Sequence, residues 1–199
     1  MKKMTLAVIT GSIREGRFGP VVTRWFTEQA NAHGLFDLDL IDLAETPLPQ
    51  VLPATPEELA AVHERPEDLR RLAGRLAAAD AFVVVTPEYN HSYPASLKNA
   101  IDWHYTQWQA KPVALISYGG YGGGVRAAEH LRQVFAELHA VTVRNTISFD
   151  NHWERFDTDG RLTAPEGPDG AAKALLDQLG WWSRALREAR AAVPYEGVQ

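Results

Sequence analysis

Residues 87–92 combine side chains that suit recognition of a flat ring. The stretch contains a rigid proline, the aromatic Tyr89, the carboxamide of Asn90 and several backbone N–H groups. Together they provide a stacking surface and hydrogen bonds for the edge of a heteroaromatic ring. The apolar, β-branched run 81–85 precedes the stretch, and Pro94 opens a helical pattern after it. We therefore expect a loop at the carboxyl end of a parallel strand, where open α/β sheets bind ligands.

Residues 11–19 carry a second set of groups, suited to an anion. They lie between the strand-like run Met4–Thr10 and a helical pattern, and the first N–H groups of a helix are unpaired and favour negative charge. The glycines spell neither a P-loop nor a dinucleotide fingerprint. The hydroxyl of Ser12 and the guanidinium groups of Arg14 and Arg17 suit a terminal phosphate dianion. A solvated turn without a ligand is the alternative for this loop alone.

A third candidate stretch, residues 117–124, is rich in glycine and follows the apolar run 112–117. Glycines let the backbone approach a ligand closely, at a cost in entropy that favours a functional reason for them. Two other motifs are only half present. The match to a dinucleotide fingerprint that starts at Gly122 lacks a well-placed acidic residue beyond it. The Ser117 region resembles half of a nucleophile elbow, but Leu115 replaces its first glycine.

The run 86–102 resembles the flavin-ring loop of the NADPH-dependent FMN reductase family, which comprises flavodoxin-like quinone, azo-dye and chromate reductases. The similarity extends over residues 6–162 and includes the Gly-Ser-x-Arg loop, which holds the FMN phosphate in that family. The resemblance implies that FMN and NADPH are the cofactors. It also implies the following cofactor-binding residues: Gly11, Ser12, Arg14, Arg17, Phe18, Gly19, Pro87, Glu88, Tyr89, Asn90, Ser117, Tyr118, Gly119 and Gly120.

The alternation of strands and helices predicts an α/β fold. The strands are expected at residues 4–10, 36–41, 81–85, 112–117 and 141–147. Right-handed crossovers then favour a flavodoxin-like, doubly wound, five-stranded parallel sheet of order 2-1-3-4-5 with helices on both faces. That order brings the loops after the first, third and fourth strands to one edge. We expect a single FMN-binding domain over residues 1–199.

Helical patterns fill the connections between these strands. We expect helices at residues 20–33, 57–79 with an interruption at Pro66, 94–108, 125–138 and around 175–186. The proline-rich stretch 45–56 should lie on the surface and border an acceptor site. Three smaller expectations concern single sites: a solvated Asp42, a His104 on an interface-facing or half-buried helix surface, and a hairpin turn at Asp159 and Gly160 within residues 157–160.

Composition narrows the classes of partner. The net charge of -5 forms no basic stripe, so nucleic acid is not expected as a partner. The chain has no cysteine and no long apolar run, which favours a soluble cytoplasmic protein without a membrane span. The seven histidines form no metal-binding pair, and we expect neither a metal site nor a catalytic acid or base.

The function that we expect is reduction of quinone-like, azo or similar small-molecule acceptors by NAD(P)H through bound FMN, with ping-pong kinetics. Two alternatives stay open: a non-catalytic FMN electron carrier, and a serine hydrolase using Ser117. We also expect a homodimer or a dimer of dimers, because Trp103, Tyr105 and Trp108 leave aromatic rings on more than one face of the helix 94–108. The residues do not identify the physiological acceptor or distinguish NADPH from NADH.

Overall fold

The computed structural model describes residues 3–55, 58 and 67–195. Its sheet is parallel, in the predicted order β2-β1-β3-β4-β5. The strands are β1 (Met4–Thr10), β2 (Phe36–Asp42), β3 (Ala81–Pro87), β4 (Pro112–Tyr118) and β5 (Val141–Phe149). Four of the five strands were predicted one or two residues too short at their carboxyl ends, the edge that carries the candidate site. Every residue of β3 and β4 is buried, which explains their unbroken apolar sequences.

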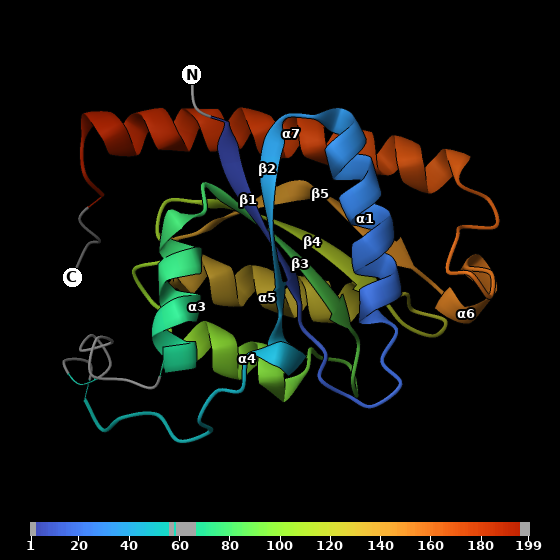
Figure 1. Cartoon of the computed structure of the whole chain (residues 1–199), viewed down its shortest axis with the longest axis horizontal. Helices are drawn as coiled ribbons and strands as arrows, with labels where there is room; N and C mark the ends of the chain where they lie inside the picture. Colours follow the sequence, from blue (N-terminus) through green and yellow to red (C-terminus); the bar gives the residue numbers. More distant parts are fainter. Residues whose placement is uncertain (1–2, 56–57, 59–66, 196–199) are drawn as a thin grey trace.

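Helices cover both faces of the sheet (Figure 1). The structure has α1 (Gly19–His33), the short η1 (Leu43–Glu45), α3 (Glu67–Ala78), α4 (Ala95–Asp102), α5 (Val125–Glu137), α6 (His152–Arg155) and α7 (Glu166–Ala192). Buried side chains of α1 and α7 pack on one face, and those of α3, α4 and α5 pack on the other. The predicted region before α3, residues 57 and 59–66, lies outside the described part of the chain.

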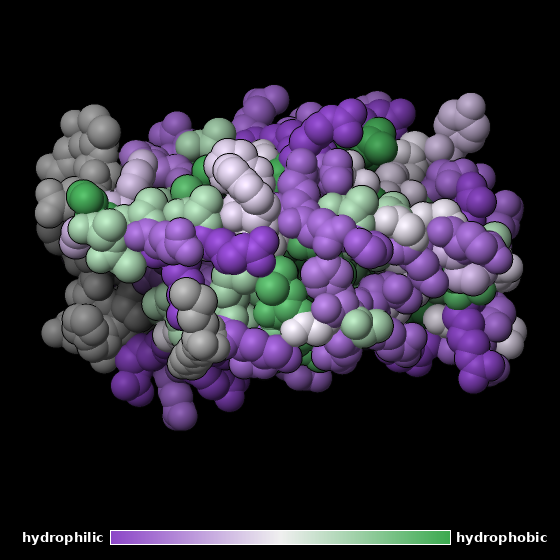
Figure 2. Space-filling model, turned by 90° about the horizontal axis from the view of Figure 1, so that it is seen from above, coloured by the Kyte–Doolittle hydropathy of each residue, from purple (hydrophilic) through white to green (hydrophobic). Residues whose placement is uncertain are grey.

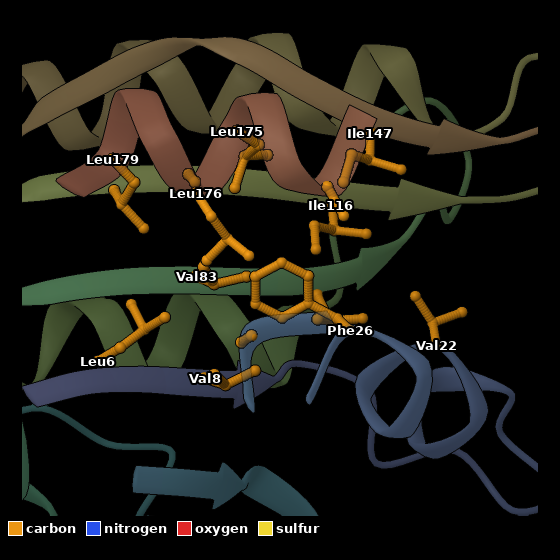
Figure 3. Close-up of a cluster of buried hydrophobic side chains, with 14 of the residues drawn as sticks. Leu6, Val8, Val22, Phe26, Val83, Ile116, Ile147, Leu175, Leu176 and Leu179 are labelled. Atoms are coloured by element: carbon orange, nitrogen blue, oxygen red, sulfur yellow. The ribbon is translucent and has the colours of Figure 1, made fainter. Parts of the chain in front are cut away.

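The core between the sheet and the layer of α1 and α7 explains the spacing of apolar residues along those two helices. Figure 3 shows Phe26 of α1 beside Val83 of the sheet, with Leu175 and Leu176 of α7 above the same strands. Gly34 ends α1 in the left-handed conformation, as expected of a C-terminal glycine. The long α7 turns charged residues outward, and the surface seen from above is largely hydrophilic with small apolar spots (Figure 2).

The prediction of a helix over residues 94–108 was wrong in its length, because α4 ends at Asp102. In a continuous helix Trp103 and Trp108 would point about 140° apart. Turns after Asp102 let both indoles be buried, and Trp108 packs against Phe82 with ring centroids 4.7 Å apart. Tyr105 alone of the three aromatics is left exposed. The aromatic faces that suggested a dimer are thus mostly used within one chain.

Two smaller predictions have different outcomes. His104 is buried rather than half-buried, and its Nδ1 lies 2.7 Å from the carbonyl oxygen of Ala100. Burial lowers its pKa. The hairpin turn at residues 157–160 is present, with the Gly160 N–H donating to the Asp157 carbonyl at 2.9 Å. No helix in the described part of the chain is long and apolar enough to cross a membrane.

Candidate functional site

The three chemistry-bearing stretches meet at the carboxyl edge of the sheet. Each begins where its strand ends. In Figure 1 the blue loop after β1 and the green loop after β3 lie close together at the lower edge of the sheet. The Gly11 N–H donates to the carbonyl oxygen of Val85 at 2.9 Å. The hydroxyl groups of Ser12 and Tyr89 lie 2.7 Å apart, which joins the first loop to the second.

The second loop is joined to the third in the same way. The Glu88 N–H donates to the carbonyl oxygen of Tyr118 at 3.2 Å. The Gly119 N–H in turn donates to the last residue of β5, Phe149, at 3.1 Å. The parallel register of the strands therefore turns three distant sequence segments into one continuous rim.

The loop after β1 offers unpaired backbone donors. Within the described chain, the N–H groups of Ile13, Glu15, Gly16 and Phe18 make no hydrogen bond. The helix α1 that follows has Phe18 as its N-cap residue, with no side-chain capping hydrogen bond and no acidic residue in the first turn. Unsatisfied N–H groups and a positive helix end attract an anion, so this cradle fits the phosphate of FMN.

The two arginines of this loop have different surroundings. Arg14 is exposed and forms no ion pair with any described residue, so its guanidinium is free to meet a phosphate. Arg17 instead places Nη1 2.5 Å from Oδ1 of Asp42 and 3.0 Å from the Ser12 carbonyl oxygen. The hydrogen bond that Arg17 donates to the Asp42 carboxylate raises the pKa of Arg17. Asp42 is therefore a partly buried ion-pair partner rather than the solvated residue we expected, and Arg17 braces the loop against β2.

Gly19 shows why this loop can approach the sheet so closely. A Cβ at that position would lie 2.9 Å from Cγ2 of Thr10 and 3.0 Å from the hydroxyl oxygen of Tyr118. Neither neighbour can withdraw easily, because both belong to buried strand residues. A larger residue would therefore push the start of α1 away from the strand.

The loop after β3 forms a tight turn with Asn90 and His91 at its tip. Their φ angles are 50° and 70°, and Tyr89 and Ser92 on either side exchange hydrogen bonds of 2.7 Å and 3.0 Å. Two successive positive φ values are typical of a type I′ turn, in which Asn is tolerated. The turn leaves the Asn90 carboxamide exposed, where it can reach the edge of a bound ring.

Glu88 connects this loop to the glycine-rich one. Its carboxylate accepts hydrogen bonds from Nη1 of Arg126 at 2.6 Å and from the Arg126 backbone nitrogen at 3.2 Å. Only 11% of the Glu88 side chain is exposed. The carboxylate thus caps the start of α5, where negative charge is favourable. Its position fits a role in holding two loops together rather than direct proton transfer.

The side chain of Ser117 holds the glycine-rich loop against the end of β4. It is buried, and its hydroxyl donates to the carbonyl oxygen of Gly123 at 2.9 Å. Gly124 has a φ of 85°, and a Cβ there would lie 2.7 Å from Cβ of Ser117. The loop therefore folds back on its own strand, and the serine is neither accessible nor free to act as a nucleophile.

Tyr118 and Gly120 lie on different sides of the rim. Tyr118 is buried beneath it, and burial raises the pKa of its hydroxyl. Gly120 is exposed, and the indole of Trp153 lies 3.7 Å from the position of a Cβ on it. Gly119 is buried, and its N–H and carbonyl groups are paired with Phe149 and His152. The exposed backbone at Gly120 is therefore what this loop presents to the open edge.

His152 and Trp153 are residues that the sequence analysis missed. Nδ1 of His152 lies 2.9 Å from the carbonyl oxygen of Gly119, and its ring centroid lies 4.5 Å from that of Phe18. His152 therefore wedges between the first and third loops, and 58% of Trp153 is exposed beside it. Their only signal was position, since they follow the fifth strand at the edge where the other loops meet.

A groove of about 770 Å³ adjoins the rim on the α4 side. One wall is the segment 46–52, which we call the strap and which belongs to the predicted proline-rich stretch. The groove is lined by Ile13, Arg14, Leu43, Thr46, Pro47, Leu48, Gln50, Leu52, Tyr89, Pro94, Ala95, Ser96, Asn99 and Asp102. Arg14 and Tyr89 thus belong to both the rim and the groove. No cluster of potential metal ligands occurs among the described residues.

Comparison with known proteins agrees with this geometry. The family model described as NADPH-dependent FMN reductase matches residues 4–154. An NAD(P)H-dependent FMN reductase of Schizosaccharomyces pombe is 39% identical over 125 residues, a match that spans 62% of each protein. A 2-hydroxy-1,4-benzoquinone reductase of Burkholderia sp is 30% identical, covering 92% of this chain and 98% of that protein.

A solved structure has the same architecture. The flavoenzyme NAD(P)H:(acceptor) oxidoreductase FerB of Paracoccus denitrificans superposes with a TM-score of 0.71 at 27% identity, covering 92% of this chain and 98% of that one. The family match includes all three loops of the rim and ends just beyond His152. On this evidence, the chain belongs to the NADPH-dependent FMN reductase family.

Proposed function

We propose that this chain is an NAD(P)H-dependent oxidoreductase that holds FMN on the rim and reduces quinone-like, azo or similar acceptors. The observation that carries the proposal is the cradle formed by the unpaired N–H groups of Ile13, Glu15, Gly16 and Phe18, which accompanies the exposed turn at Asn90. The names of the similar proteins, an FMN reductase and a benzoquinone reductase, support the same class of reaction.

The residues have distinct proposed tasks. The four unpaired N–H groups of the loop after β1 and the Arg14 guanidinium would bind the phosphate. The turn at Tyr89 and Asn90 and the exposed backbone of Gly120 would position the ring from two sides. FMN held there would supply the redox chemistry, the transfer of a hydride equivalent from NAD(P)H to the acceptor. The protein contributes orientation, so no side chain needs to act as an indispensable acid or base.

We further propose ping-pong kinetics. The rim has one open edge, and the described chain has no dinucleotide fingerprint elsewhere. The nicotinamide and the acceptor would therefore use one face in turn. Plots of reciprocal rate against reciprocal NADPH concentration at several acceptor concentrations should be parallel. Converging lines would instead show that both substrates are bound together.

A visible absorption spectrum, recorded anaerobically before and after NADPH, tests the main proposal. We expect the spectrum of oxidised flavin, which NADPH bleaches. A non-catalytic electron carrier would bind FMN but keep its absorbance. A serine hydrolase would be colourless and would react with acyl probes, an outcome that the buried Ser117 hydroxyl argues against.

The oligomeric state and the compartment stay predictions. The argument for a homodimer or dimer of dimers is weaker than the sequence suggested, because Trp103 and Trp108 are buried within one chain. Light scattering at micromolar concentration measures the mass directly, and a species of one chain mass would contradict the dimer. The expectation of a cytoplasmic location depends on the absence of cysteine and of a long apolar run in the sequence.

A further inference from the structure

The groove beside the rim has a fixed wall. The carbonyl oxygen of Pro49 in the strap accepts two hydrogen bonds from the α4 region, from Nε1 of Trp103 at 2.7 Å and from Nδ2 of Asn99 at 3.0 Å. At the other end of the strap, the buried Thr46 donates to the carbonyl oxygen of Asp42 at 3.2 Å. The strap is therefore tied to β2 and to α4, so the groove is a built feature of the fold.

The lining of the groove is mostly apolar. Seven side chains form its hydrocarbon surface: Ile13, Leu43, Pro47, Leu48, Leu52, Pro94 and Ala95. Five of them are partly or largely accessible: Ile13 and Leu52 are 57% and 40% exposed, Pro47 and Ala95 are also exposed, and Leu48 is half-buried. When a hydrocarbon covers exposed apolar side chains on a concave surface, apolar area is removed from water and the free energy of the system falls.

The charged groups of the groove are compensated. Asp102 is paired with Nζ of Lys98 at 2.6 Å. Under the proposed function, Arg14 faces the phosphate of FMN. The remaining polar lining consists of uncharged hydroxyls and amides such as Gln50. A charged acceptor would lose hydration here without gaining a counter-charge, so an uncharged ligand is favoured.

We propose that the groove binds the hydrocarbon chain of an uncharged, alkyl-substituted quinone, the acceptor of the reaction. The inference rests on the proposed function and extends it by naming the substrate class. Tyr89, shared by rim and groove, places the quinone ring at the FMN side, with its chain along the strap and α4. The quinone takes up a hydride equivalent from reduced FMN and a proton from water to give the hydroquinone, while FMN is reoxidised.

Two neighbouring residues provide a matched pair of variants. Leu52 lines the groove, whereas Val51 is 82% exposed and lies outside the lining. Both are surface residues of the strap, so neither substitution removes a core side chain. We expect Leu52→Ser to weaken the interaction with an alkyl quinone by about tenfold, the effect of losing a few methylene contacts in an apolar site. Val51→Ser should have no such effect.

The experiment compares two acceptors, a dimethoxy-methyl-benzoquinone with a decyl chain and the same ring without it. The FMN-loaded protein is reduced with dithionite, and its reoxidation by each quinone is followed by stopped flow. We expect the decyl quinone to react at lower concentration, and Leu52→Ser to remove most of that advantage. Calorimetric titration of the oxidised protein with the decyl quinone should show the same tenfold loss in affinity.

The outcomes separate the two proposals. Equal behaviour of both quinones, or equal loss in Leu52→Ser and Val51→Ser, overturns the groove assignment even when NADPH reduces the flavin. A benzoquinone sulfonate that reacts at lower concentration than the decyl quinone overturns it as well. Failure of NADPH to bleach the flavin refutes the proposed function, but dithionite reduction and calorimetry still test the groove.

Discussion

Replacing Arg14 tests most directly how the loop after β1 binds a phosphate. Arg14 is exposed and has no described ion-pair partner, so Arg14→Ala should leave the folded protein intact. A hydrogen bond to a charged group contributes roughly 1.5–3 kcal/mol. Its loss should therefore weaken FMN binding about ten- to a hundredfold. The effect should shrink as salt is added, because an exposed charge is screened.

For Arg17 we predict the opposite pattern, a larger effect on the stability of the fold than on FMN binding. Its guanidinium is committed to Asp42 and to the Ser12 carbonyl. Arg17→Ala should therefore destabilise the fold by about 1–2 kcal/mol, between the values for exposed and buried pairs. Its effect on FMN affinity should be the smaller of the two, since it acts through the position of the loop.

Fluorescence titration of apoprotein with FMN measures both variants, and thermal unfolding of the apoprotein measures stability separately. Arg161→Ala is the control, because its side chain is 80% exposed on the hairpin beyond α6. Equal FMN affinity for Arg14→Ala and the parent would remove Arg14 from the site. A larger loss for Arg17→Ala than for Arg14→Ala would refute the assignment of the two roles.

Three further predictions concern the support of the site and the stability of the fold. Glu88→Gln should lower the rate of flavin reduction only modestly in stopped flow, because the carboxylate caps α5; a variant that keeps FMN but loses hydride transfer would contradict this. Burial lowers the pKa of Lys111 to about 8, below its unfolded value, so its charge costs stability below pH 8. The free energy of unfolding of the parent protein, relative to that of Lys111→Met, should rise by on the order of 3 kcal/mol as pH increases from about 8 to 10.5. If the difference between the two proteins does not change with pH, the lowered pKa of Lys111 is contradicted. Gly124→Ala should lose at least about 2 kcal/mol in chemical denaturation, because φ is 85° and Cβ would meet Ser117, whereas Gly74→Ala, with open space in α3, should be neutral or stabilising.

Local patterns in the sequence were enough to predict the sheet. A strand buried on both faces is mostly apolar, and the runs 81–85 in β3 and 112–116 in β4 show this directly. The order of the strands followed from the short list of topologies that right-handed crossovers allow. That order also predicted that the three loops would meet, because the carboxyl ends of parallel strands share one edge.

The partners of individual side chains were decided only by tertiary structure. Arg17 pairs with a residue 25 positions away, Glu88 with one 38 positions away, and His152 contacts a carbonyl 33 positions away. Periodicity predicts which face of an element is buried, but not which polar group on another element lies within hydrogen-bonding distance. The length of α4 has the same cause, since it depends on where the pocket for Trp108 lies on the sheet. Local composition thus determined the elements and their order, and long-range packing determined which site residues are free and which are already bound.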